Sequence, residues 1–151
     1  MHNSDKMLII LPCGKKKIWD KKPSAGRTSA RYAYTSNYFK LCVQYAEKFS
    51  DEWVIFSGKY GLIEPNFMVN GSYDIRVKAT EGIRNKIKEQ LKPFISVRFS
   101  SFVSLCGEDY SQILKEVLDL FGLKLYTPLE GLRIGMKQKR IKECLELNTP
   151  L

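Results

Sequence analysis

Short apolar runs alternate along the chain with longer segments whose apolar residues recur at helical spacing. Strands are expected at the apolar runs, near residues 7–12, 53–57, 100–106 and 123–126. Helices are expected at 36–49, 79–94, 109–121 and 136–147. The first run is apolar on both faces, which is typical of a parallel strand covered by helices on both sides. The alternation therefore predicts a single three-layer α/β domain, in which a mainly parallel sheet of at least four strands carries helices on both faces.

With 151 residues, the chain is long enough for one domain with its own core, and residues 1–6 are expected to form a flexible tail. The apolar runs are too short to span a bilayer, and the first residues lack the pattern of a secretory signal. We therefore expect a cytoplasmic protein with no membrane partner. The four cysteines lack CxxC spacing and the single histidine is His2, so neither a metal site nor a cofactor is expected.

The charge balance is strongly basic, with 25 Lys+Arg against 16 Asp+Glu and a formal net charge of +9. Excess positive charge of this size is typical of proteins that bind nucleic acid. DNA or RNA is therefore the predicted partner. The alternative is a basic surface that is merely solvated and binds nothing specific.

Glycine-containing segments follow each of the expected strands. Because ligands bind at the carboxyl ends of strands in open α/β sheets, these segments are expected to line one cleft that binds phosphate. The candidates after the strands are Cys13, Gly14, Lys15, Lys16, Lys17, Ser57, Gly58, Tyr60, Gly61, Gly107, Gly131, Arg133 and Gly135. Tyr34, Thr35 and Ser36 join them, because free N–H groups at the start of a helix favour an anion. The alternative is a set of solvated turns, and the GxxxxGK[ST] pattern of a P-loop is absent.

A long irregular connection leaves the second expected strand and ends at Tyr73 and Asp74. Connections of this length are uncommon unless they are functional. Asp74 is the first candidate catalytic carboxylate, Glu130 the second, and Lys59 a candidate catalytic cation. A carboxylate near C1′ of a sugar stabilises the positive charge that develops when an N-glycosidic bond breaks. Aspartate in a loop is also a common capping residue, which is the structural alternative for Asp74.

Several motifs together resemble a family of small proteins of microbes and phages whose function is unknown. They are Cys13-Gly14-Lys15-Lys16-Lys17, Tyr34-Thr35-Ser36, Ser57-Gly58-Lys59-Tyr60-Gly61-Leu62, Tyr73-Asp74, Gly107 with Tyr110, and Pro128-Leu129-Glu130-Gly131-Leu132 with Ile134-Gly135. Residues 57–74 also resemble the SGLYGLLRP…YR signature of the YaaA peroxide-stress proteins, which bind DNA. The chain departs from that signature at Lys59 and Asp74, where YaaA proteins have leucine and arginine. The resemblance implies a fold related in outline to uracil-DNA-glycosylase-like domains, although no GQDPY-type motif is present.

Three functions are compatible with these residues. The first is an enzyme on nucleic acid, most concretely a base N-glycosylase, in which tyrosines such as Tyr60 and Tyr73 hold the extruded base. The second is a non-catalytic DNA- or RNA-binding module, in which the same lysines bind phosphate without chemistry. The third is an enzyme acting on free nucleotides or nucleosides.

Overall fold

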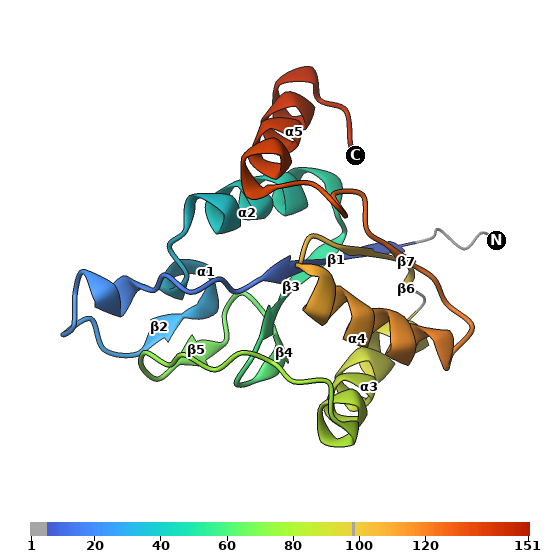
Figure 1. Cartoon of the computed structure of the whole chain (residues 1–151), viewed down its shortest axis with the longest axis horizontal. Helices are drawn as coiled ribbons and strands as arrows, with labels where there is room; N and C mark the ends of the chain where they lie inside the picture. The colour runs from blue at the N-terminus through green and yellow to red at the C-terminus, as the bar shows by residue number, and fades with distance from the viewer. Residues whose placement is uncertain (1–5, 98) are drawn as a thin grey trace.

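A computed structural model of the chain describes residues 6–97 and 99–151 (Figure 1). Of the tail expected at residues 1–6, residues 1–5 lie outside the described residues, and Lys6 is instead the first residue of a strand. A five-stranded sheet has the order β4-β3-β1-β6-β7. Its strands are β1 (Lys6–Pro12), β3 (Glu52–Ser57), β4 (Gly61–Ile63), β6 (Phe99–Ser104) and β7 (Leu125–Tyr126). Neighbouring strands pair in parallel except β4, which pairs antiparallel with β3. The predicted mainly parallel α/β sheet is confirmed.

Helices cover both faces of this sheet (Figure 1). In that view α2 (Asn37–Phe49) and α5 (Ile134–Leu147) lie above the sheet, and α3 (Glu81–Ser96) and α4 (Glu108–Asp119) lie below it. Successive side chains of β1 point to opposite faces of the sheet, as strand geometry requires. Ile9 and Leu11 belong to the core under α2 and α5, whereas Leu8 and Ile10 belong to the core with α3 and α4. A strand that is apolar on both faces is therefore central and buried.

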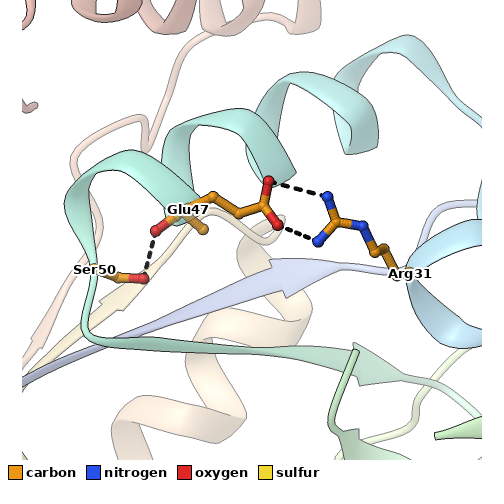
Figure 2. A network of polar contacts seen from close by, with 4 residues as sticks. Arg31, Glu47 and Ser50 are labelled. Atoms are coloured by element: carbon orange, nitrogen blue, oxygen red, sulfur yellow. Dashed lines mark hydrogen bonds and ion pairs between the residues drawn. The ribbon is translucent and has the colours of Figure 1, made fainter. Parts of the chain in front are cut away.

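The expected cap at the start of the first long helix is present. The Ser36 hydroxyl accepts a hydrogen bond from the Phe39 backbone N–H at 3.1 Å, and α2 begins at the next residue, Asn37. At the other end, the Ser50 hydroxyl donates to the Ala46 carbonyl at 2.6 Å (Figure 2). The start and the end predicted for this helix are therefore confirmed.

A bidentate ion pair ties a short helix, α1 (Ala30–Ala33), to α2. Figure 2 shows the Arg31 guanidinium facing the Glu47 carboxylate, to which both of its terminal nitrogens are bonded. More than a third of each side chain is exposed, so solvent screens the pair and it contributes less than about 1 kcal/mol. Its main effect is to orient α1 beside the sheet.

The sequence did not predict the small elements that lie beside the carboxyl ends of β1 and β3 in Figure 1. These are α1, the 3-10 helix η1 (Ile18–Asp20) and a two-stranded antiparallel sheet of β2 (Thr28–Ser29) and β5 (Met68–Val69). The Ala30 N–H donates to the Phe67 carbonyl at 2.8 Å, which joins segments far apart in the chain. Two-residue strands held by such distant pairing leave no periodic pattern in the sequence.

Two predicted turn positions lie inside regular elements. The last helix begins at Ile134 instead of 136, with Arg133 at its N-cap, so Gly135 is helical. Gly61 is the first residue of β4, where it has a φ of +75° and where an added Cβ would lie 2.4 Å from the Gln90 side-chain oxygen. A helix end commonly shifts by about one or two residues from a sequence pattern, and the start of β4 is set by the pairing of Gly61 with Ser57 of β3. No helix among residues 6–97 and 99–151 is long and apolar enough to cross a membrane.

Candidate functional site

A cavity of about 390 Å³ opens at the carboxyl ends of β1 and β6, and we call it the edge cavity. The loop after β1, the segment 73–76 and the start of α4 supply its walls. The lining residues are Pro12, Cys13, Gly14, Lys15, Lys17, Tyr73, Asp74, Ile75, Arg76, Gly107 and Tyr110. As expected, the loops that follow two parallel strands meet there, together with the Tyr73-Asp74 segment from the long connection.

Residues 73–77, which we call the strap, are held against the protein on both sides. The Val77 N–H donates to the Tyr110 hydroxyl at 3.1 Å, and the Arg76 guanidinium pairs with Asp109 at 3.0 Å. Beneath the strap, a Cβ added to Gly58 would lie 1.8 Å from the Ile75 carbonyl oxygen. The glycine loop after β3 therefore supports the strap from below and does not itself line the edge cavity.

The Tyr73 hydroxyl anchors the start of the strap in a buried hydrogen-bond network. It is bonded to the Tyr34 hydroxyl at 2.5 Å and to the Ser57 hydroxyl at 2.6 Å. Ser57 Oγ also accepts the backbone N–H groups of Lys59 and Tyr60, both at 3.1 Å. Burial raises the pKa of Tyr73 to about 12, although its hydrogen bonds with Ser57 and Tyr34 act in the opposite direction. The network is therefore neutral at physiological pH and serves to position Tyr73.

Replacing Tyr73 by phenylalanine keeps the ring and removes only this anchor. The hydroxyls of Tyr34 and Ser57 would lose a partner while remaining 1% and 0% exposed, respectively. Removing a hydrogen-bond partner from buried hydroxyls costs about 1–3 kcal/mol, so we expect Tyr73→Phe to lower the free energy of unfolding by that amount in urea titrations. The control is Tyr126→Phe, at a ring that is 63% exposed, which should stay within about 0.5 kcal/mol of wild type. Equal stability of the two variants would contradict the assigned network.

Lys17 places a buried cation at the edge cavity. The residue is 3% exposed, and its ammonium donates to the Lys15 carbonyl at 3.0 Å. The ammonium also lies 4.6 Å from the centroid of the Tyr73 ring, within the range of a cation–π contact. Within the described ranges Lys17 makes no ion pair. Lys59 lies 5.7 Å from the same ring centroid, outside the cavity wall.

Asp74 lines the edge cavity together with Lys15 and Lys17. The residue is exposed, and among residues 6–97 and 99–151 its side chain accepts no hydrogen bond and joins no ion pair. A loop-capping aspartate would bond to nearby backbone N–H groups, which is the usual role of aspartate in a turn. The arrangement therefore favours a carboxylate that is available to a ligand over a capping residue.

Cys13 also lines the edge cavity, at the end of β1. Burial raises the pKa of its thiol, although a hydrogen bond from the Gly58 backbone and the charge of Lys17 act in the opposite direction. A thiol with a raised pKa is protonated at neutral pH and is a poor nucleophile. Cys13 is therefore assigned to the cavity wall.

The structure does not bring the fourth glycine segment to the edge cavity, which corrects the expectation of one cleft. Glu130 borders a separate hollow of about 490 Å³ beside α4, and it lines a much smaller one together with Gly131. Arg133 and Gly135 lie at the start of α5. The reason is geometric, because β7 is the edge strand, only two residues long, and Thr127 and Glu130 after it lie beside α4, on the side of that helix that borders β7.

The remaining predicted residues surround the edge cavity without lining it. Ser36 caps α2, and its hydroxyl would lie 3.4 Å from a Cβ on Gly14, so it packs under the loop after β1. The Thr35 N–H donates to the Lys16 carbonyl at 3.1 Å, while the Lys16 side chain is exposed. The Tyr60 ring packs against Tyr73, with ring centroids 5.6 Å apart, and so is not free to stack on a base.

Sequence reasoning missed Arg76 as a site residue. Arg76 lines the edge cavity and lies two residues after Asp74. The sequence did give one indication of its role, because Arg76 lies in the same long connection as Asp74. No local pattern, however, indicates that this part of the connection lies beside the loop after β1 and contacts the start of α4.

Comparison with known proteins places these residues within a family. The model of the family described as "Family of unknown function (DUF6884)" matches residues 8–143, a range that contains every residue lining the edge cavity. The "Uncharacterized protein YfjM" of Bacillus subtilis (strain 168) is 38% identical over 120 residues, covering 75% of this chain and 77% of that protein. The predicted membership of a family of unknown function is thus confirmed, and the likeness to YaaA proteins stays a prediction.

Proposed function

The chain belongs to the DUF6884 family of unknown function, and we propose that it acts on nucleic acid by holding one nucleotide in the edge cavity and hydrolysing its N-glycosidic bond. The observation that carries the proposal is that the Asp74 carboxylate, which has no hydrogen bond or ion pair among the described residues, shares a cavity with the cations Lys15 and Lys17. A volume of about 390 Å³ lies in the range of small-molecule sites and suits a single nucleotide.

The chemistry assigns separate roles to the two kinds of charge. As the bond between C1′ and the base nitrogen breaks, its electron pair leaves with the base and positive charge develops on the sugar. The Asp74 carboxylate stabilises that charge and accepts a proton from the water that attacks C1′. The departing base takes up a proton from solvent, and Asp74 afterwards returns its proton to solvent, so overall one water is consumed, its hydroxyl on C1′ and a hydrogen on the base. The cations hold the phosphate and keep the nucleotide in register.

A base-release assay tests the proposal. The full chain is incubated with single- and double-stranded DNA and RNA that carry ordinary and modified bases, and free base is measured by mass spectrometry. We expect release of one kind of base, and an abasic site in the strand. Binding without release from any of these substrates would instead support the non-catalytic binding module, which the net charge of +9 and the exposed Lys15 and Lys16 also favour.

Free nucleotides are the second candidate substrate. The observation in their favour is the cavity itself, which is large enough for one nucleotide and carries cations on its wall. Turnover of a mononucleotide together with no salt-dependent binding to long strands would select this alternative. Turnover only on strands would exclude it.

We expect Lys15→Ala to weaken binding to long DNA or RNA about equally for all sequences. Lys15 is exposed at the cavity, and a lysine that contacts phosphate carries no base-specific information. Losing one phosphate contact should reduce the slope of log affinity against log salt by about one, measured by fluorescence anisotropy over a range of KCl concentrations. The control is Lys124→Ala, an exposed lysine immediately before β7 and therefore at the amino-terminal end of the parallel strands, away from the edge cavity. An unchanged slope for Lys15→Ala would remove this residue from the nucleic-acid interface.

A further inference from the structure

Lys17 differs from the other lysines around the edge cavity because it is buried. Its residue is 3% exposed, whereas Lys15 and Lys16 are exposed. Burying a charge is strongly unfavourable unless the charge is paired. Within residues 6–97 and 99–151, however, Lys17 has no carboxylate partner, and its ammonium has only the Lys15 carbonyl and the Tyr73 ring.

The backbone around Lys17 holds the side chain in this position. The Lys17 N–H donates to the Asp20 carboxylate at 3.0 Å, and Lys17 pairs with Tyr34 in an isolated antiparallel bridge. Two residues further on, the buried Trp19 ring donates to the Gly26 carbonyl at 2.9 Å. The local structure therefore directs a lysine inward, where a solvated basic turn would direct it outward.

The ammonium of Lys17 has unused capacity for a ligand. An ammonium carries three N–H donors, and one hydrogen bond and one ring face leave at least one donor free. Both contacting residues, Lys15 and Tyr73, line the edge cavity, as Lys17 itself does. An anion in the cavity is thus the partner that the buried charge lacks.

We propose that Lys17 forms a phosphate subsite, in which its ammonium binds a non-bridging oxygen of the phosphate of the nucleotide in the edge cavity. The inference rests on the proposed function, because it takes the phosphate to be part of the nucleotide in the edge cavity. It adds that the protein distinguishes a nucleotide from the corresponding nucleoside, and that this discrimination depends on one buried cation. Because the pair is buried, it is less screened by salt than the contacts of the exposed lysines.

The test measures binding to the full chain by calorimetry with inorganic phosphate, the common nucleoside 5′-monophosphates, the matching nucleosides and a short oligonucleotide. We expect Lys17→Met to weaken phosphate and monophosphate binding about tenfold to a hundredfold, as loss of a charged hydrogen bond should. Nucleoside binding should not change. The control Lys124→Met, at the amino-terminal end of the parallel strands, should bind all of these ligands like wild type. The oligonucleotide distinguishes a phosphate within a strand from that of a free nucleotide.

Thermal unfolding gives a second readout. Replacing Lys17, which has no ion pair within residues 6–97 and 99–151, by methionine removes a buried charge, so we expect the Tm of Lys17→Met without phosphate to equal or exceed that of wild type. Phosphate should raise the Tm of wild type and not that of the variant. If the methionine variant does not fold, Lys17→Gln, which keeps a donor without the charge, takes its place in the same measurements.

Two results would overturn the subsite. One is a Lys17 variant that binds phosphate as tightly as wild type, and the other is a wild-type protein that binds nucleosides as tightly as their monophosphates. The outcome is separate from that of the base-release assay. If Lys17→Met loses phosphate binding while the wild-type protein releases no base, the subsite is supported and the glycosylase is refuted. If the wild-type protein releases base while Lys17→Met binds phosphate like wild type, the glycosylase is supported and the subsite is refuted.

Discussion

Asp74→Asn is expected to reduce base release by about 10²- to 10⁴-fold on the substrate that the wild-type protein cleaves. The amide is nearly isosteric with the carboxylate, but it neither carries the charge that stabilises a cationic sugar nor accepts a proton from water. In the same variant, affinity for the nucleic acid should be unchanged or higher, because a carboxylate beside Lys15 and Lys17 repels phosphate. Single-turnover rates and equilibrium binding measured on the same strand separate the two effects.

A second aspartate provides the control for this prediction. Asp119 is exposed at the end of α4 and does not line the edge cavity, so Asp119→Asn should retain wild-type base release. Full activity of Asp74→Asn on a demonstrated substrate would falsify the catalytic assignment. The cations of the edge cavity would then belong to a binding module.

Gly58→Ala is expected to disrupt both the stability of the protein and the site. The new Cβ would lie 1.8 Å from the Ile75 carbonyl oxygen and 3.1 Å from the Tyr110 hydroxyl, so the strap must move. Overpacking of this kind costs about 1–3 kcal/mol, which should appear as a lower free energy of unfolding. Because a displacement of about 1 Å can cost about a hundredfold in rate, movement of Asp74 with the strap should also reduce base release by that order.

The control for the strap is Gly71→Ala, in the same long connection. Nothing lies within 4 Å of the added Cβ there, and Gly71 is not among the glycines with positive φ. This variant should keep both the stability and the activity of wild type. If Gly58→Ala behaves like Gly71→Ala, the strap does not depend on the close approach of Gly58 for its position.

Much of the fold could be predicted from the sequence, because the signals that specify it are local. An apolar run such as residues 7–12 can be satisfied only by burial on both faces, and the stripe of α2 requires a sheet to pack against. Ser36 marks the start of that helix by its own hydrogen bond. Parallel pairing also brings the ends of β1 and β6 to one edge, so the contribution of Lys15, Lys17 and Gly107 to one cavity follows from topology.

The tertiary structure alone decided that the strap completes the site, that Glu130 lies outside it, and which lysine is buried. The strap reaches the edge cavity because Gly58 allows a close approach and because Tyr34, Ser57 and Tyr110 bind it, and these contacts join segments far apart in the chain. The same absence of a local signal explains Glu130, which directly precedes Gly131 in a predicted site segment and yet borders a separate hollow beside α4. Among three consecutive lysines, composition cannot distinguish Lys17 from its neighbours. Its burial depends on a bridge to Tyr34 that exists only in the folded chain.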